Sequence, residues 1–130
     1  MTTPLWCLAI VAFLPYPLAF LGGYFKTRQF GRADNKQPRQ QSALLEGAGA
    51  RAVAAQSNAW EALGIFTAVQ AVLHFANPEA ARSNTAANLS LVYLATRLLH
   101  PVLYLANIDL GRSAVFVVGM VCLVWLVVLA

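Results

Sequence analysis

Residues 5–25 read LWCLAIVAFLPYPLAFLGGYF, an apolar run of 21 residues that contains no charged side chain. At a rise of about 1.5 Å per residue, an α-helix of this length crosses the roughly 30 Å hydrocarbon core of a bilayer. Pro15 and Pro17 lie inside the run, and prolines are tolerated in membrane helices where neighbouring groups satisfy the freed carbonyls. The run therefore predicts a bent membrane-spanning helix.

The composition of the whole chain also indicates that the protein lies in membrane lipid. Of the 130 residues, 59% are apolar and only 11% are charged, whereas a soluble domain carries about 25% charged residues. A soluble fold of this size could not hide so much apolar surface from water. We therefore predict a single all-α domain that is surrounded by membrane lipid.

Three further apolar segments follow, at residues 50–75, 87–106 and 114–130. The first belongs to a helical run that extends from about Ser42 to Ala76 and opens with many Gly and Ala residues, which let helix backbones approach closely in lipid. The last is uncharged over 17 residues, at the short end of the range for a span. Together with residues 5–25, these segments predict an integral membrane four-helix bundle.

The basic residues indicate how the bundle is oriented. Residues 26–41 form a polar loop with five of the nine Lys and Arg residues, and Arg112 precedes the last span, whereas the connection after the second span has only Arg82. Because cytoplasmic loops carry the excess of Lys and Arg, we expect the first and third loops in the cytoplasm and both termini outside. No aromatic residue follows Phe30 within the basic loop, so a nucleic-acid partner is not predicted.

Two of the predicted helices carry a stripe of polar residues inside the membrane. The stripes consist of Arg51, Asn58 and Glu61 on the second helix and of Tyr93, Arg97, His100 and Tyr104 on the third. Spacings of three, four and seven residues place each set on one helix face. A charge at the bilayer centre costs at least about 2.5–3.5 kcal/mol, so these side chains are expected to face the bundle interior. Either they form interhelical salt bridges that fix the packing, or they form a ligand site.

The residue types favour a ligand that carries both carboxylates and an amine. An Arg guanidinium offers a planar fork to a carboxylate, and Glu61 suits an ammonium group. A metal site is not predicted, because His74 and His100 have no partner at a metal-binding spacing.

In its motifs the chain resembles the MAPEG family, the membrane-associated proteins in eicosanoid and glutathione metabolism. The loop sequence DNKQPR at residues 34–39 is similar to the DN-x-x-PR loop of bacterial members. Residues 51–61 resemble the family pattern RA-x-x-A-x-x-N-x-x-E, and residues 97–104 resemble R-x-x-H-x-x-x-Y, with an RS element at residues 112–113. The ordered combination covers essentially the whole chain.

The resemblance implies a homotrimer in a bacterial inner membrane, with glutathione bound between neighbouring protomers near the cytoplasmic face. Asn58 and Glu61 would hold the glutathione peptide and its γ-glutamyl amine, and His100 and Tyr104 would line the site. The other members of the polar stripes would contribute to binding as well: Arg51, Tyr93 and Arg97.

The resemblance also implies a reaction. Arg112 would stabilise the glutathione thiolate, as a nearby cation does, and Ser113 would lie beside it. The thiolate would attack an electrophilic lipophile that enters from the bilayer. The predicted function is accordingly that of a glutathione-dependent transferase or peroxidase acting on hydrophobic electrophiles.

Two other functions stay open. The family's glutathione-using eicosanoid enzymes carry an Arg four residues before the motif Asn, where this chain has Ala54, and the turn between Tyr104 and Arg112 is one residue shorter than in their pattern. These departures fit a non-catalytic membrane subunit or scaffold that binds a larger membrane protein. A small multidrug-type exporter would instead use Glu61 as its proton and cation site, although the Arg residues of the stripes would repel cationic substrates.

Overall fold

In the computed structural model, which describes all 130 residues, the first apolar run forms two successive helices. α1 (Thr3–Phe13) and α2 (Pro15–Phe30) are separated at Leu14. The N–H of Leu14 donates to the carbonyl of Val11, three residues back, at 3.2 Å. Because Pro15 has no N–H with which to continue the ladder, the helix is interrupted at this point.

The polar loop begins at the end of α2 and contains the short helix α3 (Pro38–Ala43). Gly31 ends α2 in the left-handed conformation, with φ of +80°, which glycine adopts without steric cost. The prediction of a continuous helical run from about Ser42 is wrong. Ser42 belongs to α3, and α4 (Gly47–Ala76) starts at Gly47, whose φ of +52° lies outside the right-handed helical region.

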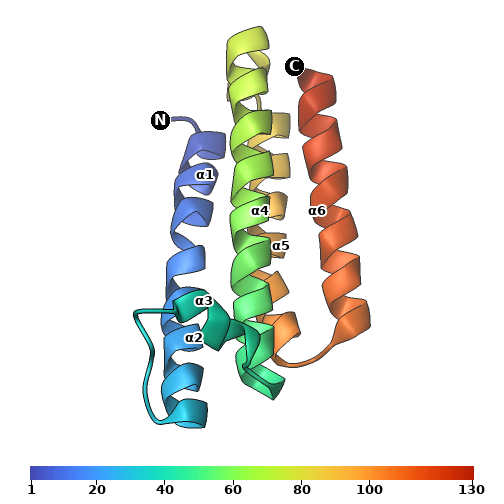
Figure 1. Ribbon diagram of the computed structural model, residues 1–130. Helices are drawn as coiled ribbons and strands as arrows, with labels where there is room; N and C mark the ends of the chain where they lie inside the picture. Colours follow the sequence, from blue (N-terminus) through green and yellow to red (C-terminus); the bar gives the residue numbers. More distant parts are fainter.

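α4 lies at the centre of the bundle, between the α1–α2 pair and α6 (Figure 1). The N-terminal half of its buried face consists of small residues, namely Gly49, Ala52, Ala55, Ala59 and Ala62. The spacing at Gly49 shows how closely the backbones approach, since a Cβ built there would lie 3.1 Å from the Cβ of Phe25 in α2. Small residues thus allow α2 and α4 to pack closely, as they do in membrane bundles generally.

The second half of the chain forms a helical hairpin. After the 3₁₀ turn η1 (Ala80–Arg82), the hydroxyl of Ser83 caps α5 (Asn84–Leu105) by accepting a hydrogen bond from a first-turn N–H at 3.1 Å. A short turn with a left-handed Asn107 leads into α6 (Asp109–Leu129). In Figure 1, α5 lies behind α4 and α6 lies beside it, and both chain termini are at the same end of the bundle.

Apolar side chains form the core between these helices and also cover the outside. The main core cluster includes Cys7, Phe66, Leu73 and Leu126. On the outer surface, Phe20 is 80% exposed and Phe75 is 88% exposed. Such extensive apolar surface is typical of a protein that contacts lipid.

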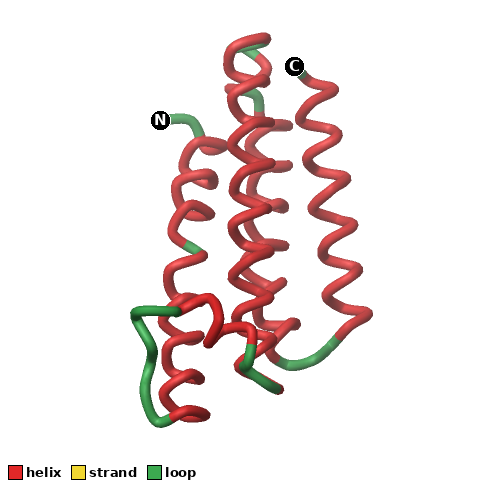
Figure 2. Tube along the Cα trace, viewed as in Figure 1, coloured by secondary structure: helices red, strands yellow, loops and turns green.

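Three helical segments are long and apolar enough to cross a membrane, namely Thr3–Phe30, Gly47–Ala76 and Asp109–Leu129. Figure 2 shows that short loops join the helices, apart from the longer connection that contains α3. α5 is not among the three candidates, because polar residues such as Arg97 and His100 interrupt its apolar sequence. Its crossing of the membrane stays a prediction.

Candidate functional site

Arg97 is a buried charge near the middle of α5, where only 4% of it is exposed. Its Nε donates to the hydroxyl of Thr96 at 3.3 Å, and its Nη2 donates to the carbonyl of Val115 in α6 at 3.4 Å. The guanidinium carbon lies 5.2 Å from the ring centre of Tyr93, which is within cation–π range. The Tyr93 hydroxyl donates to the carbonyl of Ala62 in α4 at 3.0 Å. These contacts connect α5 to α6 and to α4.

Gly119 of α6 makes the position of Arg97 possible. A Cβ built on Gly119 would lie 2.9 Å from Nη2 of Arg97 and 3.0 Å from the hydroxyl of Thr96, closer than side-chain atoms normally approach. Gly119 was not among the predicted site residues. The signal that could have identified it is the one glycine within the apolar segment 114–130, because glycine inside a helix costs stability and is often kept for a packing reason.

A small hollow of about 110 Å³ opens beside Arg97. Its polar lining comes from Asn58 and Glu61 of α4 and from Tyr93 and Arg97 of α5, and Gly119 forms part of its wall. Asn58 is half-buried and Glu61 is exposed, so the hollow is reached from outside the chain. An amide, a carboxylate and a guanidinium therefore line one space.

A second hollow, of about 270 Å³, adjoins the first near the turn between α5 and α6. Its polar lining consists of Asn58, His100, Tyr104, Arg112 and Ser113. Asn58 and Phe116 line both hollows. Ligand pockets in proteins typically measure roughly 300–1,000 Å³, so a ligand that occupies both hollows would have a site near the lower end of that range.

Arg112 stacks on an aromatic ring at the edge of the second hollow. Its guanidinium carbon lies 4.2 Å from the ring centre of Tyr104, and the rings of Tyr104 and His100 are 5.7 Å apart. Stacking of this kind orients the planar guanidinium and leaves its N–H groups available. The side chain of Arg112 donates no hydrogen bond within the chain, so these groups can contact a ligand.

Eight of the nine side chains predicted for the site line these two hollows. Arg51 does not, because its Nε donates to the carbonyl of Leu105 at the end of α5, at 3.3 Å. Such carbonyls lack a partner within their own helix and often bind a basic side chain. No salt bridge joins Arg51, Glu61 or Arg97 to an opposite charge. Within the chain, Arg51 and Arg97 thus connect helices through backbone carbonyls and not through the salt bridges that one of the two interpretations predicted.

An apolar groove of about 290 Å³ continues from the small polar hollow along α4 and α6. Ile65, Met120 and Leu123 line both spaces. The rest of the groove is lined by valine side chains of the two helices. Polar and apolar spaces thus form one continuous surface on this side of the bundle.

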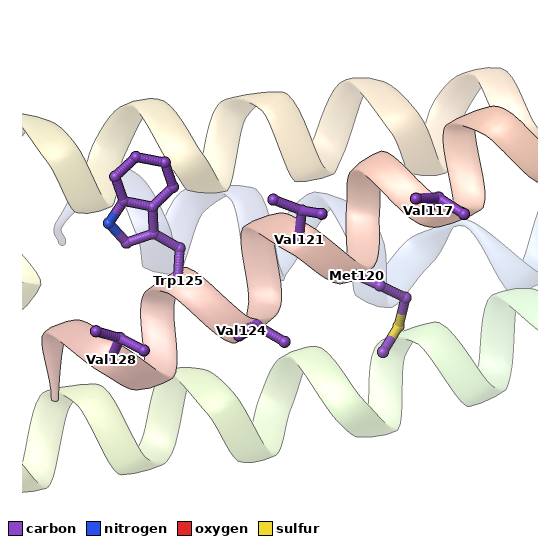
Figure 3. Close-up of a pocket in the computed structure, with 6 residues that line it drawn as sticks. All are labelled: Val117, Met120, Val121, Val124, Trp125 and Val128. Atoms are coloured by element: carbon purple, nitrogen blue, oxygen red, sulfur yellow. The ribbon is translucent and has the colours of Figure 1, made fainter.

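The largest hollow, of about 500 Å³, lies on α6 alone and is lined by six apolar residues. Figure 3 shows Trp125 and Met120 pointing to opposite sides of the helix, with Val121 and Val124 between them. A ligand site normally contains a few polar groups that orient the ligand. This hollow has none, so the candidate site is the pair of polar hollows.

Comparison with known protein families matches residues 3–130 to the MAPEG family. No curated protein and no solved structure gives a significant match. The family match covers all but the first two residues, and it agrees with the three helices that are apolar and long enough to span a membrane. This chain therefore belongs to the MAPEG family and is an integral membrane protein.

Proposed function

We propose that this protein is a glutathione-dependent transferase or peroxidase that acts on hydrophobic electrophiles. The MAPEG family includes glutathione transferases and peroxidases as well as non-catalytic members. The observation that carries the proposal is the meeting of polar residues from α4, α5 and α6 in two hollows that share Asn58.

The charges and donors of the hollows match the groups of glutathione. Glutathione carries carboxylates, an ammonium group, peptide groups and a thiol. Glu61 suits the ammonium group, and Arg97 offers N–H donors to a carboxylate. The Asn58 amide can both donate to and accept from a peptide group. Because Asn58 lines both hollows, it is suited to bind the middle of an extended tripeptide.

The second hollow supplies the groups for thiolate chemistry. Arg112 is oriented by the ring of Tyr104 at 4.2 Å and keeps its N–H groups free for a ligand. A neighbouring guanidinium stabilises a thiolate relative to the thiol. We therefore assign Arg112 the stabilisation of the sulfur anion, with the Ser113 hydroxyl as a second donor from the same turn of α6.

The apolar groove supports a lipophilic second substrate. It shares Ile65, Met120 and Leu123 with the small polar hollow, and that hollow shares Phe116 with the second one. An apolar molecule lying in the groove would therefore extend past Phe116 to place its reactive end beside the thiolate at Arg112. The outer walls of the groove belong to two helices that are apolar enough to lie in lipid. The electrophile would thus enter from the bilayer.

The exposure pattern of α5 supports a fourth membrane span. Between Ser90 and His100 its polar side chains are buried, while its outer face carries exposed apolar residues, namely Leu91, Val92, Leu98, Leu99 and Val102. At 22 residues, α5 measures about 33 Å, enough to cross the bilayer core. On this proposal the protein has four spans, with its termini outside and its basic first loop in the cytoplasm of a bacterial cell, whose inner membrane it occupies.

The open side of the hollows supports assembly into a homotrimer. Glu61 is exposed within a single chain, although a charged group at this depth of the membrane is costly unless it is covered. A neighbouring protomer would cover Glu61 and close the site. Glutathione would then bind between protomers.

Calorimetric titration of glutathione into the protein in lipid nanodiscs tests the proposal. Wild-type protein should bind glutathione and conjugate it to an aryl halide. Glu61→Gln should weaken binding roughly 10- to 100-fold, because hydrogen bonds to charged groups contribute about 1.5–3 kcal/mol. Glu79→Gln, which changes an exposed carboxylate at the other end of the bundle, should bind like the wild type. Absence of glutathione binding to the wild type would overturn the proposal.

Further measurements distinguish the proposed function from the two alternatives, a non-catalytic subunit and an exporter. A non-catalytic subunit, which Ala54 would explain, should copurify with a larger membrane protein and show no thiol chemistry. An exporter should show proton-coupled uptake that Glu61→Gln abolishes. The exporter is disfavoured by the hollow itself, because Arg97 lines the same space as Glu61 and a guanidinium repels a cationic substrate.

A further inference from the structure

One end of the bundle carries a basic surface that the proposed catalytic site does not use. We define the basic surface as the side chains of Lys26, Arg28, Arg32, Lys36 and Arg39. All except the half-buried Lys26 are exposed. They come from the end of α2, the loop that follows it and α3, which lie together at the lower end of the bundle in Figure 1.

Hydrogen bonds hold the backbone of this surface in place. The Gln41 side chain donates to the carbonyl of Arg32 and accepts from the N–H of Asp34, both at 2.8 Å. Lys26 Nζ donates to the carbonyl of Pro38 at 2.8 Å, which ties α3 to α2. The backbone of the loop is therefore a defined structure that presents these cations at one end of the bundle.

The acidic residue within the loop does not neutralise these cations. Oδ1 of Asp34 accepts from the backbone N–H of Lys36 at 2.8 Å and of Gln37 at 3.4 Å. This is the usual role of aspartate in a turn. The side chains of Arg32, Lys36 and Arg39 make no hydrogen bond or salt bridge within the chain, so they are available to an external anion.

The basic surface lies where lipid headgroups are expected. The α1–α2 segment has 28 residues and measures about 42 Å, so it extends beyond the roughly 30 Å bilayer core. Tyr24 is exposed in the last turns of α2 and Phe30 at its end, and aromatic side chains are typical of the membrane–water boundary. The far end of the bundle has a single basic residue, Arg82, with Glu79 close by in sequence.

We propose that the basic surface binds the phosphate headgroups of anionic phospholipids. Its cations are spread over a helix end, a loop and a short helix, an arrangement that suits a row of headgroups at a membrane surface. Clusters of Lys and Arg directly beside a membrane span attract anionic lipids, and each residue near the surface contributes a factor of about five in affinity. The proposal is independent of the glutathione chemistry.

Native mass spectrometry of protein released from nanodiscs provides the test. The nanodiscs contain equal amounts of phosphatidylglycerol and phosphatidylcholine in both leaflets, so the orientation of insertion does not affect the result. Wild-type protein should retain phosphatidylglycerol preferentially. The triple variant Arg32→Gln, Lys36→Gln, Arg39→Gln should retain at least about fivefold less. Arg82→Gln is the matched control at the opposite end and should retain as much as the wild type.

Two further measurements make the result decisive. The first uses wild-type protein alone, so it does not depend on whether the triple variant folds. Raising the salt to about 1 M, where the screening length is about 3 Å, should release phosphatidylglycerol from the wild type. The second is equilibrium dialysis of inorganic phosphate against wild-type protein in nanodiscs of phosphatidylcholine alone, which should show no phosphate binding. Phosphate binding in this experiment would indicate that the basic surface binds a free anion and not a lipid headgroup. Equal retention of both lipids by the wild type, or undiminished retention of phosphatidylglycerol by a folded triple variant, would overturn the proposal.

Discussion

The guanidinium of Arg97 occupies the space that a side chain at Gly119 would fill, since a Cβ there would lie 2.9 Å from Nη2. This contact brings α5 and α6 together beside the small polar hollow. The guanidinium is the end of a flexible side chain, whereas the Thr96 hydroxyl at 3.0 Å belongs to a short one. Gly119→Ala should therefore displace Arg97 and destabilise the protein by about 1 kcal/mol, at the low end of the cost of overpacking. Thermal unfolding in detergent measures the effect.

Gly64→Ala is the matched control for this substitution. Gly64 also lies inside a helix, and a Cβ built on it meets no atom within 4 Å. Alanine is the better helix former, so this variant should unfold at the wild-type temperature or slightly above it. If Gly119→Ala proves as stable as Gly64→Ala, Arg97 does not depend on the glycine.

The stacking of Arg112 on Tyr104, at 4.2 Å, predicts a change in pH dependence. If Arg112 stabilises the thiolate of bound glutathione, Arg112→Ala should raise the pKa of the bound thiol, because a cation favours the charged form. The conjugation rate should then reach its plateau at higher pH than in the wild type. Thiolate absorbance measured against pH reports the shift directly.

Two variants control for the loss of Arg112. Arg112→Lys retains the charge and should keep the thiol pKa closer to that of the wild type than Arg112→Ala does. Arg82→Ala removes an exposed cation at the other end of the bundle and should leave the pH profile unchanged. An unaltered profile in Arg112→Ala would remove Arg112 from the proposed chemistry.

Ala54 offers a gain-of-function test. It lies four residues before Asn58, one helical turn away on the same side of α4. Ala54→Arg would add a guanidinium near the polar hollows and should tighten glutathione binding about tenfold or more, as a charged hydrogen bond does. Titration calorimetry compares it with Ala54→Gln, which adds bulk without charge. Equal affinities of the two variants would contradict the prediction.

The cap of α5 predicts a stability effect far from the site. The Ser83 hydroxyl accepts from the N–H of Ala86 at 3.1 Å, and loss of such a cap costs about 1 kcal/mol. Ser83→Ala should lower the unfolding temperature, whereas Ser83→Asp should retain most of the stability. Ser57→Ala, an exposed position inside α4, should have little effect.

Much of the site followed from helical spacing. Tyr93, Arg97, His100 and Tyr104 share one face of any α-helix at spacings of three and four residues, and the structure turns that face inward on α5. The start of α4 could not be predicted in the same way. The helix is interrupted between Ala43 and Gly47, where Glu46 is extended and Gly47 has a left-handed φ. Glycine permits that conformation without requiring it, so the sequence alone does not place the break.

By itself the sequence determined the helical membrane class, the family motifs and the polar face of each helix, because these depend on composition and on the helical repeat. The tertiary structure decided which polar groups meet. Asn58 lines both hollows, whereas Arg51, two turns earlier on α4, binds the carbonyl of Leu105. The separation and offset of packed helices decide such outcomes. In this protein the separation of α5 and α6 depends on close contacts between them, such as that of Gly119 with Arg97. The periodicity of a single helix does not predict contacts between helices.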